Sequence, residues 1–404
     1  MLPFRRLFRV LKICAAMLLV ALVALVGVVA FDHTFETSLP RPGGPREVAR
    51  TMMVWSDADH ADPFAPQPGT PRTLLAWIWY PATVSPGAES AQEYLPRAWR
   101  QALNEQRGVL VSALLTRNLG TVRSHSIQSS VVADQPRRFP VVVFRPGLSA
   151  LTLGYTALAE DLASRGYVVV GFDAPFRTAL VVTPDGRVVL RTPQNDLDRL
   201  AANELEPAAL RLQRGWSADI AFALDQLRQL DESESGLLAG RLDLEHVGVF
   251  GHSLGGATAA QFCHDDARCK AGIDMDGALR GSVVSDGLEQ PFLFLLSDHS
   301  NEPGAESGRI VADLDSAVRA RPTEKQVLVL AGANHFGFSD DGAFLKSPPL
   351  RRLLRWFGAI RLDGARQIEL TRALAAAFFD VHLKGAARSE LVRAESEPEV
   401  RREY

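Results

Sequence analysis

The chain has 404 residues, of which 47% are hydrophobic and 23% are charged. This composition is typical of a globular protein with a large core, and the length allows one large domain or two ordinary ones. The formal net charge of −3 excludes the strongly basic surface that nucleic-acid-binding domains carry. We therefore expect no nucleic-acid partner.

The first 34 residues differ in kind from the rest. Four basic residues precede an uncharged apolar run of nineteen residues at 13–31. This run is long enough to cross a bilayer core and exceeds the usual apolar core of a cleaved signal peptide. The basic flank predicts a cytoplasmic N-terminus with the rest of the chain exported, periplasmic or secreted. We expect residues 13–31 to anchor the protein to the inner membrane, while small residues at 28–30 leave a cleaved signal as the alternative.

Residues 35–404 are expected to form one α/β domain. Two strands open it, and a polar, partly helical segment at 83–135 then lies where lids or pocket walls are often inserted. The later alternation of apolar strands and helices predicts a mostly parallel sheet covered on both faces, whereas the charged tail after Gly385 is expected to be loose. Strands are predicted at 48–55, 73–80, 139–144, 167–172, 180–182, 187–190, 247–250, 271–275, 291–296 and 326–330, and helices at 98–115, 153–164, 200–230, 350–357 and 367–383.

The most informative stretch joins the 247–250 strand to an alanine-rich helix through Gly251-His252-Ser253-Leu254-Gly255. A G-x-S-x-G sequence between a strand and a helix is typical of the nucleophile elbow of α/β-hydrolases, which holds a serine hydroxyl above the sheet. The N-terminus of the following helix also favours a developing oxyanion. We therefore predict that Ser253 is a catalytic nucleophile in an α/β-hydrolase fold.

A serine nucleophile needs a base and a third group that orients the base. In this fold the acid and then the histidine follow the serine along the chain. His335 lies in a glycine-rich loop directly after the last core strand, so it is the predicted base. Asp276 and Asp298 both follow buried strands and compete for the orienting role, and position in a general α/β-hydrolase mildly favours Asp298. Asp274 is expected to face the other side of the sheet.

The loop after the 139–144 strand is expected to complete the oxyanion hole. Gly147 permits a sharp turn there, and the N–H of Leu148 would then pair with that of Leu254. A plain strand-exit turn is the alternative reading of this loop.

Two cysteines, Cys263 and Cys269, lie six positions apart between the elbow helix and the next strand. In an oxidising compartment they could form a disulfide. Two buried free thiols are the alternative.

Five segments carry a resemblance to a known family: Trp79-Tyr80-Pro81-Ala82, Phe144-Arg145-Pro146-Gly147-Leu148, Gly251-His252-Ser253-Leu254-Gly255-Gly256, Gly272-Ile273-Asp274-Met275-Asp276 and Asn334-His335-Phe336. Together they resemble the platelet-activating factor acetylhydrolase-like and dienelactone hydrolase-like α/β-hydrolases, and in particular bacterial exported relatives, over residues 47–384. The resemblance implies a serine ester hydrolase that needs no metal or organic cofactor and acts on short-acyl lipids or other hydrophobic esters. It also implies that the acid is Asp276 rather than Asp298, and that Leu148 and Leu254 donate to the oxyanion.

Pro146 departs from the family pattern, which often has a histidine before the glycine of the oxyanion loop. The Pro146-Gly147 pair also resembles cutinase-like hydrolases, so a polyester or xenobiotic esterase with the same triad is the alternative enzyme. A binding protein on an inactive hydrolase scaffold is the alternative from another class. The presence of Ser253, His335 and Asp276 favours an enzyme.

Overall fold

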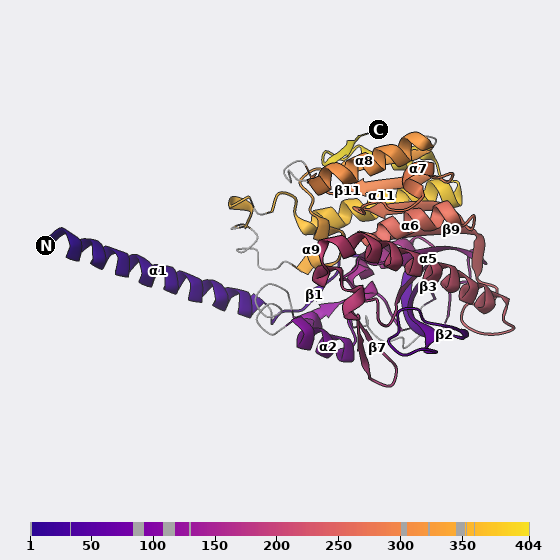
Figure 1. Cartoon of the computed structure of the whole chain (residues 1–404), viewed down its shortest axis with the longest axis horizontal. Coiled ribbons are helices and arrows are strands. Elements are labelled where there is room, and N and C mark those ends of the chain that lie inside the picture. Colours follow the sequence, from indigo (N-terminus) through magenta and orange to yellow (C-terminus); the bar gives the residue numbers. More distant parts are fainter. Residues whose placement is uncertain are drawn as a thin grey trace.

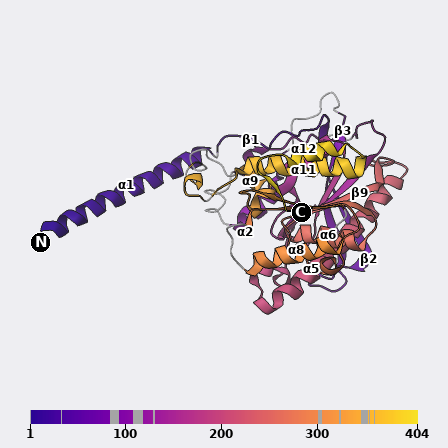
Figure 2. The ribbon, with the colours of Figure 1, turned by 90° about the horizontal axis from the view of Figure 1, so that it is seen from above.

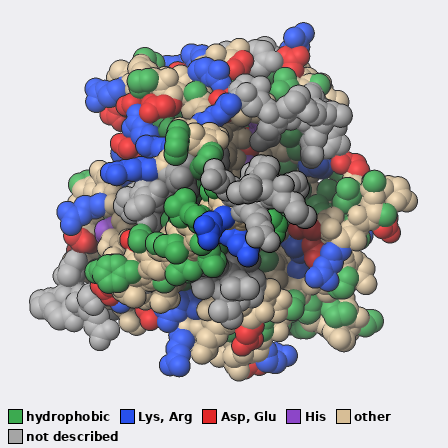
Figure 3. Space-filling model, turned by 90° about the vertical axis from the view of Figure 1, so that its left-hand side faces the viewer, with side chains coloured by type: hydrophobic (Ala, Val, Ile, Leu, Met, Phe, Trp, Pro, Cys, Tyr) green, Lys and Arg blue, Asp and Glu red, His purple; other side chains and the backbone are tan. Residues whose placement is uncertain are grey.

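The computed structural model describes residues 2–32, 34–83, 93–107, 118–128, 131–299, 305–321, 324–344, 352, 354–358 and 360–403. A single long helix, α1 (Leu2–Asp32), projects from a body in which helices cover both faces of a sheet (Figure 1). Within α1, the segment Phe8–Asp32 contains an 18-residue window with a mean hydropathy of 3.0, and its length and composition suffice to cross a membrane. Seen from the α1 side, hydrophobic side chains gather in the middle of the face, with lysine and arginine beside them (Figure 3). The helix is therefore consistent with a membrane anchor or a signal sequence.

The central sheet has nine strands in the order β13-β12-β11-β10-β9-β5-β6-β3-β2. Neighbouring strands from β12 to β6 run parallel, while β13 at one edge and β3 and β2 at the other run antiparallel to their neighbours. The predicted α/β-hydrolase fold with a mostly parallel sheet is thus confirmed. The strands of this sheet are β2 (Glu47–Ala61), β3 (Pro71–Ala82), β5 (Phe139–Arg145), β6 (Val168–Asp173), β9 (Leu242–His252), β10 (Cys269–Met275), β11 (Phe292–Leu296), β12 (Lys325–Leu330) and β13 (Val400–Arg402). Outside it, β1 (Thr37–Ser38) pairs with β4 (Val122–Arg123). The strands predicted at 180–182 and 187–190 are β7 (Leu180–Val182) and β8 (Val188–Leu190), which pair antiparallel.

Helices form a layer on each face of the sheet. Figure 2 shows α11 and α12 on one side of the strands and α5, α6 and α8 on the other. The short turns of 3-10 helix are η1 (Leu119–Thr121), η2 (Thr152–Tyr155), η3 (Pro193–Asn195), η4 (Leu197–Arg199) and η6 (His335–Phe338). The α-helices of the body are α2 (Arg97–Arg107), α4 (Thr156–Ser164), α5 (Ala202–Glu232), α6 (Leu254–Asp265), α7 (Val283–Asp286), α8 (Ala305–Ala320), α9 (Asp341–Phe344), α11 (Gly364–Lys384) and α12 (Arg388–Glu395).

The central strands are mostly apolar along their length because both faces of the sheet are covered. Along β5, Val142 and Phe144 join the core cluster shared with α4 and α11, while Val141 and Val143 join the cluster shared with α5 and α6. Side chains on a strand alternate between faces, so a continuous apolar run serves two cores at once. The carboxyl ends of these strands consequently meet at one rigid edge, which is where the predicted site residues lie.

The C-terminal tail is ordered, contrary to the expectation of a loose segment. After Gly385 the chain forms α12, and β13 then pairs antiparallel with β12. The Arg366 side chain on α11 binds Glu399 at 3.0 Å, and Ala331 N–H donates to the Glu399 carbonyl at 2.7 Å. Charges in this tail bind charges of the domain, whereas the sequence pattern alone was typical of a solvated end.

Part of the predicted insertion at 83–135 is described, and it packs on the body. Tyr94, Leu95 and Trp99 are buried in the core cluster that includes α4. The Arg50 guanidinium donates to the carbonyls of Glu93 and Tyr94 at 2.8 and 3.2 Å. The helix expected at 98–115 is α2, and positions 108–115 lie outside the described residues, as do positions 350, 351 and 353 of the helix expected at 350–357. A lid at 83–135 stays a prediction.

Candidate active site

The turn between β9 and α6 holds Ser253 in a strained backbone conformation. Its φ and ψ are 57° and −128°, a region that residues with a side chain rarely occupy. A Cβ on Gly251 would lie 2.1 Å from the Gly255 carbonyl oxygen, and one on Gly255 would lie 2.3 Å from that of Arg145. Both flanking glycines are therefore required by close backbone approach. The geometry is that of a nucleophile elbow, with Ser253 partly exposed at the start of α6.

Asp276 and His335 meet beside this turn. Asp276 directly follows β10, and its backbone N–H donates to Leu295 on β11 at 2.9 Å. Its φ of 58° turns the chain out of the sheet immediately after the strand. His335 begins η6 after β12, and its Nδ1 lies 2.7 Å from Asp276 Oδ2. The Asp276 carboxylate is 1% exposed and the His335 ring 36%, so the imidazole is the accessible member of the pair.

Asp298 contacts Gly332 and Arg401 rather than the His335 ring. Its Oδ2 accepts from Gly332 N–H at 2.7 Å, and its Oδ1 lies 3.3 Å from the Arg401 guanidinium. Its own N–H donates to the Ala333 carbonyl at 3.1 Å. Asp298 thus holds the loop that precedes His335, whereas Asp276 contacts the His335 ring.

Two residues that the sequence did not single out complete the surroundings of Asp276. Ser297 donates its N–H to Oδ1 at 2.8 Å and its hydroxyl to Oδ2 at 2.7 Å. His299 Nε2 lies 2.9 Å from Oδ1. Burial would raise the pKa of Asp276, but the hydrogen bonds from His299 and His335 outweigh it and hold that pKa well below the usual range. The position of His299, three residues after β11, was the available signal in the sequence.

His252, inside the elbow, contacts Tyr155 and His335. Its Nδ1 lies 2.6 Å from the Tyr155 hydroxyl, and its ring centroid lies 4.5 Å from that of His335. Burial, together with the nearby His335, lowers the pKa of His252 to about 3. A neutral His252 is therefore a packing partner of His335 at ordinary pH.

Asp274 lies against α6 and Gly277 rather than against His335. Alternation alone would place it on the same face as Asp276, two residues later, but β10 ends at Met275 and the φ of 58° at Asp276 turns that residue out of the strand. Asp274 Oδ1 accepts from Gly277 N–H at 2.8 Å, and a Cβ on Gly256 would lie 1.8 Å from this oxygen. Burial raises the pKa of Asp274 well above its ordinary value. This carboxyl fills the space beneath the first turn of α6.

The predicted oxyanion loop lies directly on the elbow. A Cβ on Gly147 would lie 3.2 Å from His252 Nδ1 and 3.4 Å from Ser253 Cβ. The next residue, Leu148, accepts a hydrogen bond on its carbonyl from Arg191 at 2.8 Å, and Arg191 is paired with Asp196 at 2.6 Å. The segment after β8 therefore fixes this loop, a contact that sequence reasoning missed.

Leu148 and Leu254 also share an apolar cluster next to the elbow. Leu254 begins α6 and is buried there, and Leu148 is partly buried against the same cluster. The other members are the buried Phe64, Leu212 and Trp216 and the partly buried Phe176 and Leu197.

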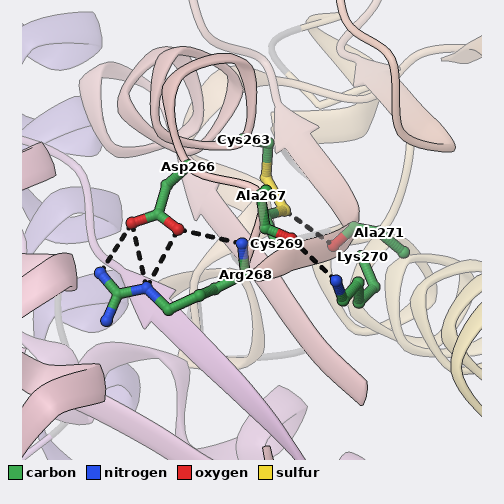
Figure 4. Close-up of a disulfide and its surroundings, with 7 residues drawn as sticks. All are labelled: Cys263, Asp266, Ala267, Arg268, Cys269, Lys270 and Ala271. Atoms are coloured by element: carbon green, nitrogen blue, oxygen red, sulfur yellow. Dashed lines mark hydrogen bonds and ion pairs between the residues drawn. A yellow bond between two sulfur atoms is a disulfide. The ribbon is translucent and has the colours of Figure 1, made fainter. Parts of the chain in front are cut away.

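Cys263 and Cys269 form a disulfide that joins the end of α6 to the start of β10 (Figure 4). Their Cα atoms lie 5.1 Å apart, and both side chains are buried. Asp266, between them, accepts from the Arg268 side chain at 2.7 Å. The connection between the elbow helix and the strand that leads to Asp276 is therefore short and cross-linked.

Comparisons with known proteins agree with this architecture. The family model described as platelet-activating factor acetylhydrolase, isoform II, matches residues 67–183 and 229–400, more than half of the chain. A probable 1-alkyl-2-acetylglycerophosphocholine esterase of Arthroderma benhamiae is 23% identical over 86% of this chain and 88% of its own length. The platelet-activating factor acetylhydrolase of Cavia porcellus is 23% identical over 78% of this chain and 70% of its own length.

A solved structure is also similar. The ferulic acid esterase from Streptomyces cinnamoneus is 27% identical, with a TM-score of 0.70 over 91% of this chain and 99% of its own. The chain belongs to the platelet-activating factor acetylhydrolase family, isoform II, and is an esterase-type hydrolase with the α/β-hydrolase fold.

Proposed function

We propose that the protein is a serine carboxylic-ester hydrolase with Ser253 as nucleophile, His335 as base and Asp276 as the orienting acid. The observation that carries the proposal is the 2.7 Å contact between His335 Nδ1 and Asp276 Oδ2, beside a serine held in an elbow conformation. An ionised carboxylate only accepts hydrogen bonds, so His335 carries its proton on Nδ1. Nε2 of the neutral ring is then left to accept a proton from Ser253.

The reaction follows from these roles. Ser253 Oγ attacks the ester carbonyl carbon while His335 Nε2 takes the hydroxyl proton, and the N–H groups of Leu148 and Leu254 stabilise the oxyanion. The intermediate collapses to an acyl-enzyme as the alcohol departs with the proton from His335. Water then gives a proton to His335 and attacks the acyl carbon. The second intermediate collapses, the acid leaves, and His335 returns the proton to Ser253 Oγ. No step requires a metal ion or an organic cofactor.

The substrate class proposed is an ester with a short acyl chain, on a lipid or another hydrophobic alcohol. The relatives from Arthroderma benhamiae and Cavia porcellus are named for such an acetyl-lipid ester. The apolar cluster beside the oxyanion loop supports it, because Phe176 and Leu197 pack with Leu148 next to the reacting position. Phe176 has a φ of 69°, an unfavourable conformation for a bulky residue that tertiary packing must hold. These side chains would close the acyl pocket.

A series of p-nitrophenyl esters tests this assignment. We expect activity to fall steeply beyond an acyl length of about six carbons, because an overfilled pocket costs about 1–3 kcal/mol. Phe176→Ala should extend the accepted length, whereas Val188→Ala, at an exposed position on β8, should not. A rate that rises steadily to long chains would instead mean an open, lipase-like groove.

A second candidate is an esterase for aromatic or polymeric esters on the same triad. The similarity to the ferulic acid esterase, at 27% identity over 91% of this chain, favours it. Pro146 in the oxyanion loop, shared in pattern with cutinase-like hydrolases, points the same way. Strong activity on feruloyl or polymeric esters, with little on short-acyl lipids, would select this candidate.

We also propose that α1 stays attached and holds the hydrolase domain outside the cytoplasm, beside a membrane where amphiphilic esters concentrate. A reporter that works only outside the cytoplasm, fused after Tyr404, should be active and remain with membranes until detergent is added. Thiol alkylation without reduction should then modify Cys14 alone, because the sulfur atoms of Cys263 and Cys269 are joined in a disulfide. We expect this disulfide to stabilise the domain by about 2 kcal/mol.

A variant that lacks residues 1–31 is the control, and its reporter should be inactive. A soluble product that begins near Phe31 would mean a cleaved signal instead. Three alkylated thiols would rule out both the disulfide and an oxidising location.

A further inference from the structure

The Asp276 carboxylate is bound by two histidines rather than one. His335 Nδ1 lies 2.7 Å from Oδ2, and His299 Nε2 lies 2.9 Å from Oδ1. Ser297 supplies one further donor to each oxygen. The ordinary triad needs only the His335 contact, so the His299 contact calls for its own explanation.

Residues 297–299, which we call the 297–299 turn, supply the Ser297 and His299 donors to this carboxylate. The turn directly follows β11, and the His299 N–H donates to the Ser297 carbonyl at 3.2 Å. The middle residue, Asp298, points the other way and binds Gly332 in the loop before His335. One turn therefore holds both the acid and the loop that carries the base.

The charge of the Asp276 carboxylate determines how the His299 imidazole interacts with it. Because Asp276 is ionised, His299 Nε2 must carry a proton and donate it. This donor fixes the rotation of the carboxylate, so that Oδ2 faces His335. It also takes up part of the negative charge that would otherwise stabilise a His335 imidazolium. Both effects keep the carboxylate aligned with His335 and weaken its attraction for a second proton on that ring.

The other ionisable groups around the pair do not supply this effect. His252, on β9, is neutral at ordinary pH because burial lowers its pKa to about 3. Asp274, on β10, has a pKa raised well above its ordinary value by burial. Asp298 binds Arg401 at 3.3 Å. The His299 side chain is 20% exposed, so solvent protons reach it.

We propose that His299 is a positioning residue for the hydrolytic site: it donates from Nε2 to Asp276 and thereby extends activity toward acid pH. The inference rests on the proposed function, because it concerns the same triad. His299 acts through Asp276 and touches no reacting atom.

The test is the pH profile of kcat/KM for a short-acyl p-nitrophenyl ester. His299→Leu should move the acid limb up by about half to one pH unit, because the carboxylate regains basicity toward His335. It should also lower kcat/KM at pH 7 by about tenfold through looser alignment. His299→Gln keeps an N–H donor and should restore the wild-type limb. His246→Leu removes an exposed imidazole bound to Asp243 at 2.8 Å and is the matched control, expected to change neither value.

The outcomes separate this inference from the proposed function. If a fluorophosphonate probe does not label the wild-type protein, the proposed function is wrong. If it labels normally and His299→Leu has the wild-type acid limb with kcat/KM within twofold, only the role of His299 is wrong. A loss in His299→Leu as large as in Asp276→Asn would make His299 part of the reacting machinery and overturn the positioning role. If His299→Leu does not fold, His299→Asn, whose amide is too short to reach Oδ1, takes its place with the same expected shift.

Discussion

Replacing Ser253 with alanine should abolish ester hydrolysis while the protein remains folded. Loss of a serine nucleophile from a triad costs on the order of 10⁶ in kcat, because no other group can form the acyl-enzyme. The strained turn is set by Gly251 and Gly255 and by the backbone contact from Ser253 N–H to the Met275 carbonyl at 2.8 Å, none of which needs the hydroxyl. Initial rates and fluorophosphonate labelling should both disappear.

Ser285→Ala is the control for this variant, since Ser285 lies exposed on α7 and bonds only local groups at 2.7 and 3.1 Å. Its activity and thermal stability should match those of the wild type. More than about a tenth of the activity in Ser253→Ala would remove Ser253 from the mechanism, because residual catalysis without a nucleophile is several orders of magnitude weaker. Failure of the wild-type protein to react with the probe would favour a binding protein on a hydrolase scaffold.

The second large effect is expected at Asp276. Asp276→Asn should lower kcat by about 10³–10⁴, because the amide no longer selects the His335 tautomer with its proton on Nδ1. An asparagine also offers one acceptor oxygen where the carboxylate offers two, so it cannot satisfy His299, His335 and Ser297 together. Kinetics and melting temperature should be measured together, so that a folding defect is separated from a catalytic one.

Asp298→Asn is the comparison variant. It removes charge from a residue that binds Gly332 and Arg401 rather than the His335 ring, so we expect a much smaller loss of kcat. A larger loss in Asp298→Asn than in Asp276→Asn would transfer the acid role to Asp298.

The sequence predicted the central sheet well because its strands are buried on both faces. The run 139–144 is apolar at every position and the run 326–330 is apolar after Gln326, and each became a strand with bounds close to those expected. The elbow was predicted equally well, because close backbone approach requires glycine at positions 251 and 255 and both glycines are visible in the sequence. These features are local, so a short stretch of sequence carries them.

Features that depend on partners far away in the chain could not be predicted from a local stretch of sequence. Position along the chain mildly favoured Asp298, and only the resemblance favoured Asp276, because two strand ends look alike until the strands are placed side by side. The role of His299 depends on the direction of the 297–299 turn toward another strand. The tail after Gly385 looked solvated because its charges have partners on α11 and after β11, far away in the sequence.

The two edges of the sheet bear on how copies of this protein can associate. Its last strand, β13, is only three residues long and carries Arg401 and Arg402. At the opposite edge, the start of β2 is already bonded through Ile127, and its end is distorted by a register shift between Asp57 and Ala61. Short, charged, covered or bulged edges resist the addition of a strand from another molecule. Two such domains can therefore meet without their sheets merging, which favours association through helical or loop surfaces.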